Sequence, residues 1–193
     1  MVIGITGGVG SGKSTVLNVI RENKNCFLLL TDDIAKKLQE PGESSYKRIV
    51  EIFGTCILNE DKTINNSKLA ELVFENKEKL ELLNNITHPN VINYVSSFIN
   101  SHKNCLIILE SALLLDTELK NFCDSIWFIY VSENIRRERL KLNRNYTDEK
   151  INKMIKNQKS EKFFFDNCDI IIYNEDFEEM KKNVIKNLQY LNY

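Results

Sequence analysis

The chain has 193 residues, of which 42% are hydrophobic, and its formal net charge is -1 at pH 7. This length suits one domain with a core large enough to need no disulfide or structural metal. Basic and acidic residues are intermixed along the chain, which argues against general binding to nucleic acid or to a membrane surface. Neither is therefore expected as a partner.

Cysteine usage and the N-terminus bear on the cellular compartment. The five cysteines are Cys26, Cys56, Cys105, Cys123 and Cys168. They form no C-x-x-C pair, so we expect small buried thiols in a reducing compartment rather than a zinc site. The N-terminus lacks the basic region and long apolar stretch of a secretory signal. The apolar-rich run at 105–115 is too short to cross a bilayer, and the sequence predicts a cytoplasmic protein.

The most informative stretch is residues 2–15, VIGITGGVGSGKST. An apolar run precedes a glycine-rich turn that fits the template G-x-x-x-x-G-K-[ST] of a phosphate-binding loop. The glycines let successive N–H groups converge on an anion, and the next helix points its positive end at that anion. Lys13 supplies a charge for the β and γ phosphates, and Ser14 a hydroxyl ligand for Mg²⁺. The residues predicted to bind nucleotide here are Gly10, Ser11, Gly12, Lys13, Ser14 and Thr15.

The rest of the chain alternates between apolar runs and helical patterns. The later strands are predicted at 26–30, 105–109, 126–131 and 169–173. Helical spacing is found at 46–53, 69–83, 91–98, 133–143, 148–158 and 178–191. This alternation predicts an α/β protein with a five-stranded parallel sheet covered on both faces. We expect a core of residues 1–31, 102–132 and 168–193, a helical acceptor-binding region at about 32–101 and a lid at about 133–167.

Two acidic residues follow or end predicted strands. Asp32 lies at the sheet edge where a γ-phosphate would sit, and a carboxylate there can accept the proton of an attacking hydroxyl. Alternatively, Asp32 is an N-cap residue. Glu110 is a candidate for an acid that steadies Mg²⁺, or it is a strand-end charge that faces water.

A basic cluster follows the fourth predicted strand. It consists of Arg136, Arg137, Arg139, Lys141 and Arg144. Arginines bind phosphates through paired hydrogen bonds, and a segment in this position can close over a site as a lid. The alternative is a solvated basic helix face whose charges pair with nearby acids.

Together these motifs resemble those of dephospho-coenzyme A kinases over nearly the whole chain. Residues 4–15 are similar to the first motif of that family, and residues 30–32 to its Asp-x-Asp motif, with Asp32 at the second acid. The other similar segments are Phe53-Gly54, Thr87-His88-Pro89, residues 112–116, Arg139-Leu140 with Arg144, Gln158, Cys168-Asp169 and Asn174. The chain departs from the family pattern at Leu30, Glu110, Ala112, Asp116 and Asn145.

The resemblance implies a P-loop NTPase three-layer fold and the transfer of a phosphoryl group from ATP, with Mg²⁺, to the 3′-hydroxyl of dephospho-coenzyme A. The implied catalytic residues are Lys13, Asp32, Arg139 and Arg144, and Asn174 is an implied nucleotide contact. The implied substrate-binding residues are Asp32, His88, Glu110 and Leu113. His88 precedes a proline, so it is alternatively only a helix-start residue. The expected partner is a small molecule, and the expected assembly is a monomer or weak homo-oligomer.

Two other functions fit a phosphate-binding loop. One is a small kinase that acts on a nucleoside, a nucleotide or another metabolite. The other is a nucleotide-dependent binding module or switch that has no acceptor at all. The acceptor used, and the dependence of ATP turnover on Asp32, distinguish the three.

Overall fold

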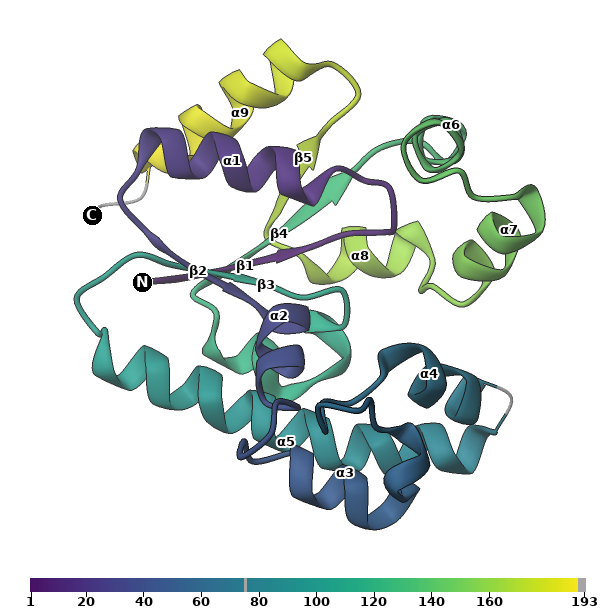
Figure 1. Cartoon of the computed structure of the whole chain (residues 1–193). Helices are drawn as coiled ribbons and strands as arrows, with labels where there is room; N and C mark the ends of the chain where they lie inside the picture. Colours follow the sequence, from purple (N-terminus) through teal and green to yellow (C-terminus); the bar gives the residue numbers. More distant parts are fainter. Residues whose placement is uncertain (75, 191–193) are drawn as a thin grey trace. The chain divides into compact units, whose positions relative to one another are not determined.

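The computed structural model describes residues 1–74 and 76–190, and within them one five-stranded sheet forms (Figure 1). Its strands are β1 (Val2–Thr6), β2 (Phe27–Leu30), β3 (Ile107–Glu110), β4 (Ser125–Tyr130) and β5 (Ile170–Tyr173). The order is β2-β3-β1-β4-β5, and β1 pairs in parallel with both β3 and β4. The predicted five-stranded parallel sheet is confirmed.

The central strand β1 is buried along its whole length, as the apolar run at the N-terminus predicts. Its register places Ile5 opposite Glu110 of β3 and Thr6 opposite Phe128 of β4. Since parallel strands end at the same edge, the residues that follow β1, β3, β4 and β5 gather at one edge of the sheet. Ligands bind at this edge in open α/β sheets.

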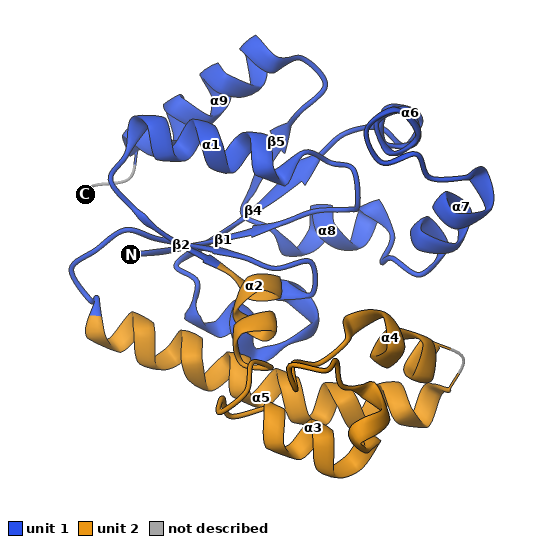
Figure 2. Ribbon diagram, viewed as in Figure 1, with its two compact units in different colours: residues 1–29, 102–193 blue, residues 30–101 orange. Residues whose placement is uncertain are grey.

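Residues 30–101 form one compact unit, and the described residues on either side of them form the other (Figure 2). The helices of the flanking unit are α1 (Lys13–Asn23), α6 (Glu133–Arg144), α7 (Asp148–Lys156), α8 (Glu161–Asn167) and α9 (Phe177–Tyr190). Helices α1 and α9 pack together on one face of the sheet, and α8 covers the other (Figure 1). Short helices that the sequence pattern did not predict are α8, η2 (Leu114–Asp116) and η3 (Glu118–Phe122).

The unit of residues 30–101 is helical and has its own apolar core. Its helices are α2 (Thr31–Lys37), α3 (Tyr46–Phe53), η1 (Thr55–Ile57), α4 (Asn66–Phe74) and α5 (Lys77–Ser101). The pattern predicted one helical stretch at 69–83 and another at 91–98. The structure instead starts a new helix at Lys77 and continues it through Pro89.

Proline inside a helix removes a backbone hydrogen bond, so the continuity of α5 needs an explanation. Thr87 Oγ1 donates to the carbonyl of Leu83 at 2.9 Å, and Asn90 Nδ2 donates to the carbonyl of Ile86 at 3.0 Å. Pro89 removes the backbone donor to the carbonyl of Asn85, while the two side-chain bonds reinforce the neighbouring turns at the carbonyls of Leu83 and Ile86. His88 therefore lies in mid-helix, and the helix-start interpretation of this residue is wrong.

The cysteines form no disulfide among the described residues. Cys56 is exposed and the other four are partly buried, so the expectation of buried thiols is wrong for Cys56. Burial raises the pKa of Cys123 and of Cys168 to about 12. In the described part of the chain, no helix combines the length and the hydrophobicity needed to cross a membrane.

Close packing under β1 leaves no room for a side chain at Gly4. A Cβ there would lie 2.6 Å from Leu114 Cδ2 and 2.7 Å from Cys123 Sγ. We expect Gly4→Ala to lower the free energy of unfolding by about 1–3 kcal/mol, as overpacking of a core typically does. Urea unfolding of the wild type and the variant measures this change.

The control for Gly4→Ala is the same substitution in a Leu114→Ala background, where one of the two clashing atoms is absent. The cost of Gly4→Ala should be smaller there, so the two substitutions should be coupled. Strictly additive free energies would show that Leu114 does not set the space at Gly4.

Candidate functional site

The loop of residues 7–12 joins β1 to α1 at the carboxyl edge of the sheet. Gly10 and Gly12 have φ angles of 79° and 83°, in the left-handed region that favours glycine. The amide of Ser11 donates to the carbonyl of Gly8 at 3.1 Å, and that of Thr15 to the carbonyl of Gly12 at 3.0 Å. The amides of Lys13 and Ser14 precede the first helical acceptor of α1, as at any helix N-terminus, and can donate to an anion.

The side chain of Lys13 folds back over this loop. Its Nζ donates to the carbonyl of Gly7 at 3.1 Å and lies 3.5 Å from Glu110 Oε1. The two side chains are only 18% and 14% exposed, so Glu110 is not a strand-end charge that faces water. The pairing of β1 with β3 brings the two residues together, and the ammonium group is held above the loop.

Asn174 and Arg139 support the loop from the opposite side. Asn174 follows β5, is 4% exposed, and donates from Nδ2 to the carbonyl of Ser11 at 2.7 Å. Arg139 donates from Nη2 to the carbonyl of Asn174 at 2.8 Å and from Nη1 to that of Ser11 at 3.5 Å. Both predicted residues therefore contact the phosphate-binding loop, and their hydrogen bonds hold the carbonyl group of Ser11.

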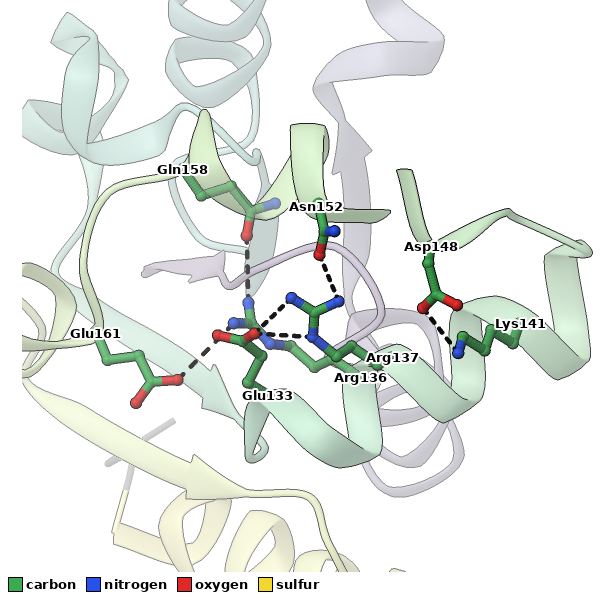
Figure 3. Close-up of polar contacts among 8 residues, drawn as sticks. All are labelled: Glu133, Arg136, Arg137, Lys141, Asp148, Asn152, Gln158 and Glu161. Atoms are coloured by element: carbon green, nitrogen blue, oxygen red, sulfur yellow. Dashed lines mark hydrogen bonds and ion pairs between the residues drawn. The ribbon is translucent and has the colours of Figure 1, made fainter. Parts of the chain in front are cut away.

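The basic side chains of α6 lie in different environments, and three of them are held by side chains of other segments or of the same helix (Figure 3). Arg136 is 8% exposed, and its Nη1 donates to Gln158 Oε1 at 3.2 Å. Arg137 is held by Glu133 and Asn152, and Lys141 is paired with Asp148. The cluster is therefore only partly a solvated helix face.

Arg144, predicted as catalytic, is exposed in the last turn of α6. Its hydrogen bond to Tyr146 is the main cause that lowers the pKa of that phenol, with Lys150 adding to the effect. Arg136 belongs to the same basic cluster, but the motif resemblance does not single it out as a catalytic residue. The signal that favours it is its position four residues before Leu140, which places both buried residues on one face of α6.

A cavity of about 350 Å³ lies beside the loop. Its lining includes Gly8, Ser11, Tyr130, Arg136, Gln158 and Glu161. In the described residues, neither the buried Ser11 hydroxyl nor the buried Arg136 Nε has a hydrogen-bond partner. The predicted nucleotide loop thus borders a cavity with unsatisfied polar groups.

Two further predicted residues of this unit are exposed. Ser14 lies in the first turn of α1, where its hydroxyl is accessible to solvent. Leu113 is 49% exposed and its amide donates to Ser111 Oγ at 3.2 Å. Ser14 offers the oxygen chemistry that Mg²⁺ prefers, and such an ion usually takes its remaining ligands from water and substrate phosphates.

Asp32 and His88 belong to the unit of residues 30–101. Asp32 is exposed in the first turn of α2, and the N-cap is Leu30, so the N-cap interpretation of Asp32 is wrong. A carboxylate in the first turn is stabilised by the helix dipole. His88 is half-buried in α5, and burial lowers its pKa.

A family model and a curated relative both match most of the chain. A family model described as dephospho-CoA kinase matches residues 1–179. A dephospho-CoA kinase of Oceanobacillus iheyensis is 37% identical over 192 residues, which cover 97% of this chain and 96% of the relative.

Two solved structures resemble the chain in fold. The TT1252 protein of Thermus thermophilus has a TM-score of 0.85 at 23% identity, over 100% of this chain and 98% of the other. A dephospho-CoA kinase of Campylobacter jejuni has a TM-score of 0.67 at 22% identity, over 97% and 95% of the two chains. At these identities the likenesses concern the fold alone.

The buried hydrogen bond from Asn174 to the loop can be tested through stability. We expect Asn174→Ala to lower the free energy of unfolding by about 1–3 kcal/mol, because the buried carbonyl of Ser11 loses its best donor. The matched control is Asn187→Ala, which removes an exposed amide-to-carbonyl bond of 2.8 Å and should cost within about 0.5 kcal/mol. Equal losses in chemical denaturation would contradict a supporting role for Asn174.

Proposed function

The chain belongs to the dephospho-CoA kinase family, and from this premise we propose which of its residues phosphorylate dephospho-coenzyme A with ATP. The reaction, a step of coenzyme A biosynthesis, moves the γ-phosphoryl group of ATP to the 3′-hydroxyl of the acceptor and releases ADP. The observation that carries the assignment is the Lys13 ammonium, held over the glycine-rich loop by Gly7 and Glu110.

Lys13 and the loop bind the donor. The N–H groups of the loop and of the first turn of α1 surround the phosphate chain, and Lys13 exchanges part of its contact with Glu110 for phosphate oxygens. Arg139 and Asn174 hold the loop carbonyls of Ser11 and Gly12 in place, which keeps the N–H groups directed at the phosphates. This preorganised positive field stabilises the charge that develops during transfer.

Ser14 fits a supporting role toward Mg²⁺, because its hydroxyl is exposed at the start of α1 next to Lys13. Mg²⁺ held there would supply positive charge that offsets the negative charge of the phosphates. Glu110 is engaged with Lys13 and sets the position of the ammonium group.

Asp32 is proposed to act on the 3′-hydroxyl of the acceptor. It is exposed at the start of α2 and its carboxylate can accept the proton or orient the nucleophile. His88 and Leu113 are proposed acceptor contacts, and Arg144 is proposed to approach the phosphates from the segment of residues 133–167. The proposed acceptor region is the helical unit of about residues 32–101.

We also propose that the protein is cytoplasmic, has no nucleic-acid partner, and is a monomer or weak homo-oligomer. Analytical ultracentrifugation of the purified protein measures the assembly directly.

The acceptor is tested by measuring ADP formation with dephospho-coenzyme A, nucleoside monophosphates, shikimate and gluconate in parallel. We expect turnover with dephospho-coenzyme A to exceed that with the others by several orders of magnitude, and mass spectrometry of the product should show one added phosphoryl group. Strong turnover with a nucleoside monophosphate and none with dephospho-coenzyme A would overturn the assignment.

Substitution of the two key residues should separate binding from transfer. Lys13→Ala should weaken ATP use, whereas Asp32→Asn should lower kcat by roughly 10²-fold or more with little change in ATP affinity. The matched control is Asp33→Asn, which alters an adjacent exposed acid paired with Lys36. It should retain near wild-type kcat.

Steady-state kinetics and ATP titration calorimetry provide these values. A similar loss of ATP affinity in Asp32→Asn and Lys13→Ala would count against the proposed role of Asp32. ATP turnover that does not depend on the acceptor and survives Asp32→Asn would point to a nucleotide-dependent module instead, since a switch needs neither an acceptor nor such an acid.

A further inference from the structure

Arg136 is the most buried arginine of α6, and it approaches the phosphate-binding loop closely. A Cβ added to Gly8 would overlap Arg136 Nη1, and one added to Gly10 would lie 3.1 Å from the carbonyl oxygen of Arg136. Both the guanidinium and the backbone of this residue therefore touch the loop. Any side chain at residue 8 would displace the guanidinium.

The donors of Arg136 are only partly used. A guanidinium has five N–H donors. Nη1 donates to Gln158 at 3.2 Å, and Nη2 lies 3.8 Å from a carboxylate oxygen of Glu161 (Figure 3). Within the described residues, Nε is buried without a hydrogen-bond partner. An unpaired buried donor is costly, and it points to an acceptor that these protein groups do not supply.

The other charged groups around the cavity are more tightly engaged. Glu133 accepts from Arg137 Nε at 2.8 Å, and Lys159 lies 3.3 Å from Asp116. The ion pair of Arg136 with Glu161 is longer than either. Of the cations that line the cavity, Arg136 and Lys159, Arg136 has the longer ion pair and the buried donor without a described partner.

The position of Arg136 along the loop indicates which phosphate of a bound nucleotide would lie beside it. Lys13 Nζ bonds to the carbonyl of Gly7, so its ammonium group lies at the Gly7–Gly8 end of the loop. In the proposed function this ammonium holds the β and γ phosphates, and Gly12 marks the other end of the loop. The cavity beside Gly8 is therefore next to the terminal phosphate.

We propose that Arg136 is a further phosphate-contacting residue, which donates hydrogen bonds to the terminal phosphoryl group of the bound nucleoside triphosphate. Gln158 and Glu161 hold its guanidinium in position, and the Ser11 hydroxyl, buried without a described partner, borders the same cavity. The inference rests on the proposed function, because it requires a triphosphate in the loop. It concerns the donor side and is independent of the identity of the acceptor.

The test compares the affinities of ATP, ADP and AMP for the wild type, Arg136→Gln and Arg137→Gln by titration calorimetry. Arg136→Gln should weaken ATP binding by roughly tenfold while ADP changes less and AMP stays constant, since a charge-assisted hydrogen bond to the terminal phosphate is lost. Arg137→Gln is the matched control, because Arg137 is the next residue on α6 and is fully engaged with Glu133 and Asn152. It should leave the ratio of ATP to ADP affinity unchanged.

Arg136→Lys provides the second variant, which retains a positive charge but lacks the planar fork. It should lower the ratio of ATP to ADP affinity less than Arg136→Gln does, and it decides the matter if Arg136→Gln does not fold. An unchanged ratio in either folded Arg136 variant, or an equal change in Arg137→Gln, would overturn the inference. These titrations contain no acceptor, so failure of the acceptor assignment would leave their result intact.

Discussion

The close contact of the phosphate-binding loop with α6 and Asn174 is the constraint on which the site depends. A Cβ on Gly8 would overlap the guanidinium of Arg136, and a Cβ on Gly12 would overlap the amide of Asn174. Gly10 faces the backbone of α6 between them. The packing of the loop against these groups therefore leaves little room for a side chain at the three glycines, and Gly10 and Gly12 also have positive φ angles. A side chain would both block the anion and separate the loop from the groups that hold it.

The strand order makes this contact possible. Because β1 lies between β3 and β4, the loop that follows β1 has the carboxyl end of β3 on one side and the carboxyl ends of β4 and β5 on the other. Glu110 at the end of β3 reaches Lys13 on one side, and Asn174 at the end of β5 reaches Ser11 on the other. The site is therefore assembled from segments that are far apart in the chain, and its geometry depends on the register of the sheet.

The sheet and the loop could be predicted from the sequence because their signals are local. Apolar runs mark buried parallel strands, and the glycine template marks the turn. The environments of the arginines could not be predicted in the same way, because the face of α6 that meets the loop is set by tertiary packing. Motif similarity favoured Arg144, which is exposed, over Arg136, which is buried. The continuity of α5 through Pro89 could likewise not be predicted from periodicity, because proline usually ends or kinks a helix.

Two arginines of α6 contact different ends of the loop and have different hydrogen-bond partners. Arg136 and Arg139 are three residues apart, so they project from neighbouring positions on one helix, and they meet the loop near Gly8 and Gly12 respectively. Arg139 donates two hydrogen bonds to backbone carbonyls, which stiffens the loop. Arg136 instead has a buried Nε donor without a hydrogen-bond partner in the described chain. Together with Lys13 they bring three positive charges to the loop, where Glu110 pairs with Lys13 and Glu161 lies 3.8 Å from Arg136. A rigid loop with a net positive field is suited to a polyphosphate chain, whose charge a single lysine would offset only in part.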